Sequence, residues 1–123
     1  MTKHKILVID DEAEICDALK MFLTQKGYDV MATTSATEGI ELVKTEKPKV
    51  ILLDIRMPDM TGLEAIKKIR EVDENVGIIM ATAVVDEDIA KETIKLGASD
   101  YIIKPFDLDY LERSLLVKIS TLT

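Results

Sequence analysis

The sequence lacks tryptophan and is poor in other aromatic residues, with two phenylalanines and three tyrosines in 123 residues. The hydrophobic core must therefore be largely aliphatic, and the hydrophobic content of 47% can supply such a core. Cysteine is almost absent as well. A single Cys16 excludes an intrachain disulfide and any redox or zinc site built on paired cysteines.

Basic residues are outnumbered by acidic ones, with 16 Lys and Arg against 23 Asp and Glu and a formal net charge of −7. Because clustered Lys and Arg are needed to neutralise phosphates, we expect no direct nucleic-acid binding. Uninterrupted apolar runs reach only four residues, and no signal peptide is visible. We therefore expect no membrane association, a cytoplasmic location, and one domain over residues 1–123.

Two kinds of apolar segment alternate along the chain. Short runs rich in β-branched residues predict strands buried on both faces, at residues 6–9, 50–53, 78–81 and 101–103. Residues 28–32 are interrupted by Asp29, which favours a strand at the edge of the sheet. Helical spacing predicts five helices, with apolar stripes at Ile15, Leu19, Phe22 and Leu23; Ala36, Ile40 and Val43; Ala65, Ile66, Ile69 and Val72; within residues 86–96; and at Leu108, Leu111, Leu115 and Ile119.

Residues suited to helix ends flank these stripes. Ser35 and Glu38 match a capping box, Gly27 suits the end of the first helix, and Asp107 suits the start of the last. Gly39, inside the second helix, indicates close packing against the sheet. Five alternating strands and helices predict an α/β fold, a doubly wound three-layer sandwich whose parallel sheet is covered on both faces.

Polar residues follow four of the five predicted strands. In such sheets ligands bind beyond the carboxyl ends of the strands, so these residues are the candidate site. They are Asp10 and Asp11 after the first strand, Asp54 after the third, Thr82 after the fourth, and Lys104 and Pro105 after the fifth. Taken singly, each has a structural interpretation, and Asp10, Asp11 or Glu12 could simply cap the first helix. Their joint placement favours a site.

Three carboxylates at one edge of a sheet repel one another unless a cation lies between them. Oxygen ligands without histidine or cysteine indicate a hard ion, Mg²⁺ or Mn²⁺. Three carboxylates, one divalent ion and Lys104 together carry no net charge. Such a site is ready to accept a phosphoryl group.

The chain resembles a response regulator receiver domain of two-component signalling, similar to the chemotaxis regulators, over essentially its whole length. The matching motifs are VIDDE at residues 8–12, LLDIRMPDMTG at 52–62, Thr82-Ala83, and Lys104-Pro105-Phe106. The resemblance implies a flavodoxin-like (βα)5 fold with strand order 2-1-3-4-5. It also implies that the protein is bacterial. It also implies a cis peptide bond between Lys104 and Pro105.

The resemblance further implies a role for each site residue. Asp54 would take a phosphoryl group from a phosphohistidine. Asp11, Asp54 and the backbone carbonyl of Arg56 would bind Mg²⁺ directly, with Mn²⁺ as a substitute, and Asp10 would bind it through water. Lys104 would pair with the Asp54 carboxylate and then with the phosphoryl oxygens.

The resemblance also implies a switch. Thr82 would bond the new phosphoryl group, Tyr101 would change rotamer, and the surface of the fourth helix, fifth strand and fifth helix would be reshaped. The implied partners are a sensor histidine kinase or phosphotransfer protein, an output domain or partner protein, and a second copy in a phosphorylation-dependent homodimer. The chain would catalyse its own phosphotransfer and autodephosphorylation, but it would be a signalling domain and not an enzyme.

Two other functions are alternatives to the switch. A small Mg²⁺-dependent phosphohydrolase would carry an Asp-x-Asp pattern after the first strand, where this chain has Asp10 followed by Glu12 two positions on. A flavodoxin-like cofactor binder would need a phosphate loop there, and the acidic run would repel the phosphate. The loop after Asp54 is expected to be structural, with Asp59 or Thr61 capping the third helix.

Overall fold

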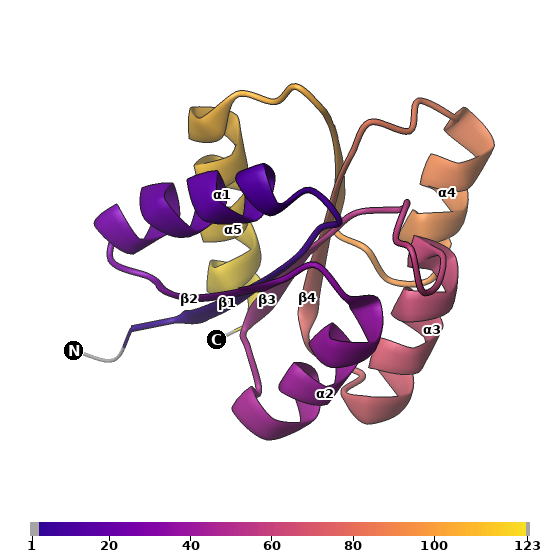
Figure 1. The fold of residues 1–123 in the computed structure, drawn as a ribbon, viewed down its shortest axis with the longest axis horizontal. Helices are drawn as coiled ribbons and strands as arrows, with labels where there is room; N and C mark the ends of the chain where they lie inside the picture. Colours follow the sequence, from indigo (N-terminus) through magenta and orange to yellow (C-terminus); the bar gives the residue numbers. More distant parts are fainter. Residues whose placement is uncertain (1–2, 123) are drawn as a thin grey trace.

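The computed structural model describes residues 3–122 and shows a parallel sheet with helices on both faces (Figure 1). The five strands are β1 (Lys5–Ile9), β2 (Asp29–Thr33), β3 (Val50–Leu53), β4 (Gly77–Thr82) and β5 (Asp100–Ile103). The five helices are α1 (Ala13–Gln25), α2 (Ala36–Glu46), α3 (Gly62–Val72), α4 (Glu87–Lys95) and α5 (Leu108–Leu122). The predicted alternation of strands and helices is confirmed. Among the described helices, none is long and apolar enough to cross a membrane.

The sheet has the order β2-β1-β3-β4-β5, with every neighbouring pair parallel, as the resemblance implied. In the register, Ile9 at the end of β1 lies beside Leu53 at the end of β3, and Leu53 lies beside Met80 of β4. Strands β1 and β3 therefore end level, and β4 continues for two more residues to Thr82. Residues that directly follow them meet at one edge of the sheet.

Two apolar layers hold the helices against the sheet. Helices α2, α3 and α4 cover one face, where Leu7 and Ile9 of β1 are fully buried (Figure 1). Helices α1 and α5 cover the other face, where Ile6 and Val8 of the same strand are buried. Alternate residues of one strand thus enter opposite layers, which is why the strand sequences are continuously apolar.

Two expectations about burial were wrong. Residues 101–103 were expected to form a strand buried on both faces, but β5 lies at the edge of the sheet and only Ile102 of this strand is buried. Ile103 is 37% exposed and is the last residue of this edge strand. Val72 is also 37% exposed, at the last residue of α3. The edge position of β2 is confirmed.

The predicted capping box at α2 is only half formed. The Ser35 hydroxyl accepts a hydrogen bond from the Glu38 amide at 3.2 Å, as expected. The Ser35 amide, however, donates to the Thr33 hydroxyl at 3.1 Å and not to the Glu38 side chain. At α3 the capping residue is Thr61, whose hydroxyl accepts from the Glu64 amide at 3.2 Å. Of the two predicted alternatives, Asp59 and Thr61, it is Thr61 that caps α3.

The other helix ends follow the sequence closely. Asp107 accepts a hydrogen bond from the Asp109 amide at 2.8 Å at the start of α5. Gly27 and Gly97 have positive φ angles of 96° and 107°, at the ends of α1 and α4. This left-handed conformation is costly for other residues, which explains glycine at both helix stops.

Gly62 starts α3 where its backbone touches the chain just after β3. A Cβ atom at this position would lie 2.7 Å from the Cα atom of Ile55 and 3.0 Å from the carbonyl oxygen of Asp54. We expect Gly62→Ala to lower the free energy of unfolding by about 2 kcal/mol, because backbone cannot move aside as a side chain can. Urea unfolding followed by circular dichroism measures this change.

Gly39→Ala is the matched control for this substitution. Gly39 packs closely on the sheet, as predicted, and an added Cβ would meet the end of the flexible Ile9 side chain. The helix propensity gained at position 39 also offsets part of the crowding. Gly39→Ala should therefore destabilise the protein less than Gly62→Ala, and equal costs would show that contact with backbone is not the reason.

Candidate functional site

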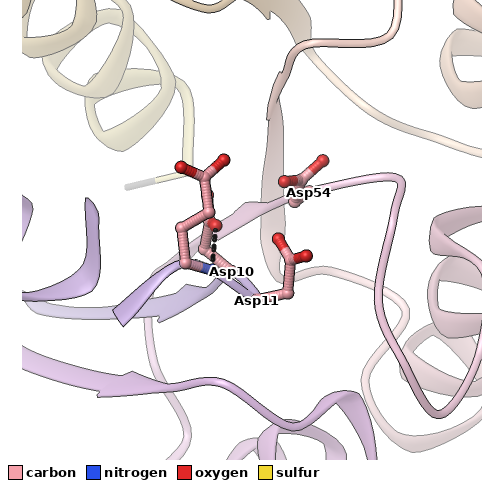
Figure 2. Close-up of side chains that lie close together, drawn as sticks. Asp10, Asp11 and Asp54 are labelled. Atoms are coloured by element: carbon pink, nitrogen blue, oxygen red, sulfur yellow. Dashed lines mark hydrogen bonds between the residues drawn. The ribbon is translucent and has the colours of Figure 1, made fainter. Parts of the chain in front are cut away.

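Four carboxylates gather at the carboxyl edge of the central strands. Asp10 follows β1 and Asp54 follows β3, and both are buried, with exposed fractions of 2% and 4%. Asp11 and Glu12 come next in the chain and are exposed. One carboxylate oxygen from each of these four residues lies within 4.8 Å of the others. Figure 2 shows Asp10, Asp11 and Asp54 converging from the two strands.

Backbone amides orient the two buried carboxylates. The Glu12 amide donates to Oδ1 of Asp10 at 2.9 Å, and the Arg56 amide donates to Oδ1 of Asp54 at 3.2 Å. In each case the donor lies two residues beyond the acceptor, in the turn that follows the strand. The backbone of Arg56 is therefore fixed beside the Asp54 carboxylate, and both carboxylates keep Oδ2 for other partners.

Lys104 supplies the cation of the site. Its Nζ atom lies 2.7 Å from Oδ2 of Asp10, 2.9 Å from Oδ2 of Asp54 and 3.2 Å from Oε1 of Glu12. The Lys104 amide also donates to the carbonyl of Thr82 at 2.8 Å, which attaches the loop after β5 to the end of β4. The peptide bond between Lys104 and Pro105 is cis, as the resemblance implied.

Burial and pairing act in opposite directions on the charged groups. Burial raises the pKa of Asp10 above its usual value, although hydrogen bonds from Lys104 and the Glu12 amide partly offset this effect. Burial alone would lower the pKa of Lys104, but hydrogen bonds and attraction from Asp10 and Asp54 outweigh it and raise this pKa. Lys104 is therefore charged at neutral pH. Its single positive charge does not balance the negative charges of the four carboxylates.

The donor set fits a hard divalent cation. It consists of oxygen atoms only, as Mg²⁺ and Mn²⁺ prefer, and the lone Cys16 thiol contacts the Asp10 carbonyl and not the carboxylates. Glu12 changes the expected charge balance, since four carboxylates with Lys104 and one divalent ion leave one negative charge. The Glu12 side chain is 56% exposed, so water screens most of that excess.

Thr82 and Tyr101 are joined through one residue of the loop after β4. The Thr82 side chain is fully buried, and its hydroxyl accepts a hydrogen bond from the Val84 amide at 3.2 Å. The Tyr101 hydroxyl donates to the Val84 carbonyl at 2.7 Å, and the side chain packs, partly buried, against the core. A displacement of residue 84 would therefore be felt at both side chains.

The structure thus brings together Asp10, Asp11, Asp54 and Lys104, with the Arg56 backbone beside them. Thr82 ends the adjacent strand β4, and Tyr101 lies one strand further out, on β5. Pro105 follows Lys104 in the loop before α5. Glu12 was not predicted as a ligand. The signal that could have identified it is its place in the acidic run, directly after Asp10 and Asp11. Instead of capping α1 with its side chain, Glu12 turns its carboxylate to Lys104.

Comparison with known proteins agrees with this geometry. Residues 6–116 match the family model of the response regulator receiver domain. Sporulation initiation phosphotransferase F of Bacillus subtilis is 34% identical, over 89% of this chain and 88% of that protein. Chemotaxis protein CheY of Thermotoga maritima is 40% identical, over 83% of this chain and 86% of that protein.

A solved structure extends the agreement to the whole fold. The CheY-like response regulator receiver domain protein of Methanospirillum hungatei superposes with a TM-score of 0.95 at 29% identity. The match covers 98% of this chain and 97% of that one. With the family match and the carboxylate and lysine cluster at the sheet edge, these likenesses place the chain in the response regulator receiver domain family of two-component signalling.

Proposed function

We propose that the chain is a phosphorylation-activated switch that takes a phosphoryl group from a sensor histidine kinase, or from a phosphotransfer protein, onto Asp54. The observation that carries this proposal is the environment of the Asp54 carboxylate. Asp54 is buried, held by the Arg56 amide through Oδ1 and by Lys104 through Oδ2, and surrounded by three further carboxylates. A carboxylate fixed in this way is poised for in-line attack.

The transfer needs little acid–base chemistry from the protein. An Asp54 carboxylate oxygen forms the new bond to phosphorus while the bond from phosphorus to the donor imidazole nitrogen breaks, and that nitrogen keeps the electron pair. Lys104 stays protonated throughout and can follow the negative charge from the Asp54 carboxylate to the phosphoryl oxygens. The protein contributes by positioning and by charge neutralisation.

The carboxylate cluster would hold one Mg²⁺ ion, for which Mn²⁺ can substitute. Asp11, Asp54 and the Arg56 carbonyl would bind it directly, and Asp10 would bind it through water. When bound, the ion supplies positive charge to the oxygens of the transferring group. The carboxylate oxygens, which lie within 4.8 Å of one another, and the fixed position of the Arg56 backbone support this assignment.

Phosphorylation would then shift an equilibrium between two surfaces. Thr82 would bond the phosphoryl group and give up its contact with the Val84 amide, which displaces the residue whose carbonyl holds the Tyr101 hydroxyl. Tyr101 is a partly buried residue of β5 that packs against the core, so its movement would reshape the surface of α4, β5 and α5. An output domain, a partner protein or a second copy of the chain would read that surface.

We extend this proposal to the whole chain. Residues 1–123 would act as one receiver domain in the cytoplasm, without contacts to membrane or nucleic acid. Its reactions with its own phosphoryl group would serve signalling and not the turnover of a substrate.

Acetyl phosphate tests the chemistry without a kinase. We expect intact mass spectrometry to show the gain of one phosphoryl group with Mg²⁺ and none with excess EDTA, because the carboxylates repel the incoming phosphate unless a cation is present. Labelling that is equal in EDTA would contradict the metal requirement. Sustained turnover of an added phosphomonoester would indicate a phosphohydrolase instead.

Beryllofluoride, a stable phosphoryl mimic, tests the surface change. In amide NMR spectra with Mg²⁺, we expect shifts in the loop after β4 and across α4, β5 and α5. Replacing Thr82 with valine should keep the shifts around Asp54 but reduce those beyond Val84, because the hydroxyl that links them is gone. Shifts confined to the neighbourhood of Asp54 in the unaltered protein would contradict the switch.

A further inference from the structure

We infer that Asp59 is a positioning residue for the metal and phosphoryl site, although it contributes no group to that site. It ties the tip of the loop between β3 and α3 to the start of α2, and this tie sets the position of the Arg56 backbone. The inference rests on the proposed function for its metal, but its structural half is testable without one.

The tie consists of three hydrogen bonds between segments more than twenty residues apart. Oδ1 of Asp59 accepts from the Ala36 amide at 3.1 Å, and Oδ2 accepts from the Thr37 amide at 2.8 Å and the Ser35 hydroxyl at 3.1 Å. These amides belong to the first turn of α2, where backbone donors lack partners within the helix. A carboxylate is the group that this helix end favours most.

The hydrogen bonds of the tie lower the pKa of the Asp59 carboxyl group. Asp59 lies at the surface, yet the hydrogen bonds from Thr37, Ala36 and Ser35 hold its pKa well below the usual range. Asp59 is therefore charged at any pH near neutrality, and the contact is charge-assisted.

The loop that carries Asp59 is closed on itself, so its tip and its base move together. Arg56 and Thr61 form an antiparallel bridge across the loop, and the Gly62 amide donates to the Ile55 carbonyl at 2.7 Å. Arg56 stands at the base of this closed loop, with its amide on the Asp54 carboxylate. Fixing the tip at Asp59 therefore restricts the backbone of Arg56.

The other end of the tie leads back to the first acidic loop. Ser35, which bonds Asp59, also donates its amide to the Thr33 hydroxyl at 3.1 Å. Thr33 in turn accepts a hydrogen bond from the Asp10 amide at its carbonyl, at 3.1 Å. The start of α2 thus serves as a common frame for the loop that carries Asp10 and the loop that carries Arg56.

Asp59→Ala is the substitution that tests this inference. In NMR titrations of amide shifts with Mg²⁺, we expect the dissociation constant to rise about tenfold, at the lower end of the effect for residues that orient metal ligands. In the metal-free protein, we expect the Arg56 amide to exchange its hydrogen faster. Asp59→Asn keeps one oxygen acceptor and should give an intermediate value for both measurements.

Thr61→Ala is the matched control. It removes the cap of α3 in the same loop and should cost comparable stability in urea, but it leaves the three Asp59 contacts in place. We expect its Mg²⁺ dissociation constant to stay within about twofold of the unaltered protein, because the Arg56 backbone keeps its frame. Equal changes in Asp59→Ala and Thr61→Ala, or none in Asp59→Ala, would overturn the inference.

Failure of the proposed function would look different. If the unaltered protein bound no Mg²⁺, the metal assignment would be wrong, but faster exchange of the Arg56 amide in Asp59→Ala alone would still support the positioning role. If the unaltered protein binds Mg²⁺ and Asp59→Ala changes neither affinity nor exchange, the positioning role is wrong and the proposed function stands.

Discussion

Replacing Asp54 with asparagine is expected to abolish phosphorylation by acetyl phosphate. The amide has nearly the same shape as the carboxylate, and its single oxygen can keep one of the two contacts that Asp54 makes, with the Arg56 amide at Oδ1 or with Lys104 at Oδ2. It carries no negative charge and is a poor nucleophile, so no acyl phosphate can form. Intact mass spectrometry should show the labelled species in the unaltered protein and none in Asp54→Asn.

Asp29→Asn is the matched control for charge. Asp29 begins the edge strand β2 and is exposed, so the substitution removes one negative charge without touching the site. The extent and rate of labelling should be unchanged. Residual labelling of Asp54→Asn at the level of the control would show that another residue accepts the phosphoryl group.

Replacing Lys104 with methionine is expected to lower the free energy of unfolding by about 3 kcal/mol near neutral pH in the absence of Mg²⁺. The ammonium group is the cation that contacts both buried carboxylates, and its removal leaves Asp10 and Asp54 without a charged partner. Urea unfolding monitored by circular dichroism measures the loss. Lys104→Arg, which keeps the charge, should recover part of the stability.

The cost of Lys104→Met should depend on pH in a defined direction. Burial already raises the pKa of Asp10, and loss of the lysine removes the contacts that oppose that rise. A carboxyl group with a raised pKa in the folded state destabilises that state above this pKa and ceases to do so once it is protonated. The stability deficit should therefore shrink as the pH falls below the raised pKa of Asp10, and it should be smallest below the usual carboxyl pKa of about 4, where the carboxyl group is protonated in both states.

Excess Mg²⁺ should also reduce that deficit, because it supplies positive charge to the same carboxylates. A deficit that is constant with pH and indifferent to Mg²⁺ would show that Lys104 acts through packing of its side-chain carbons. The charges of Asp10 and Asp54 would then not be the reason for its position.

The sequence predicted the edge of the sheet where the site lies, for a simple reason. Parallel strands place their carboxyl ends together, so Asp10, Asp54, Thr82 and Lys104 could be grouped from their positions after apolar runs. Helix ends were also predictable, because Ser35, Thr61 and Asp107 act on amides within three residues of themselves. Local rules sufficed wherever the partners were close in the chain.

Contacts between distant segments could not be predicted in this way. Asp59 could have capped α3, which begins three residues later, but it bonds the start of α2, more than twenty residues earlier. Nothing in the local pattern distinguishes these two uses of an aspartate. The exposure of Ile103 was missed for a related reason, since an apolar run does not reveal whether a further strand lies beside it.

The central claim is that Asp54 accepts the phosphoryl group, and chemical mapping of the acyl phosphate tests it most directly. Borohydride reduces an acyl phosphate of aspartate to homoserine, which peptide sequencing by mass spectrometry can place on one residue. After incubation with Mg²⁺ and acetyl phosphate, we predict homoserine at position 54 and at no other aspartate. Homoserine at Asp10 or Asp11, or none at position 54 in protein that has gained a phosphoryl group, would contradict the claim.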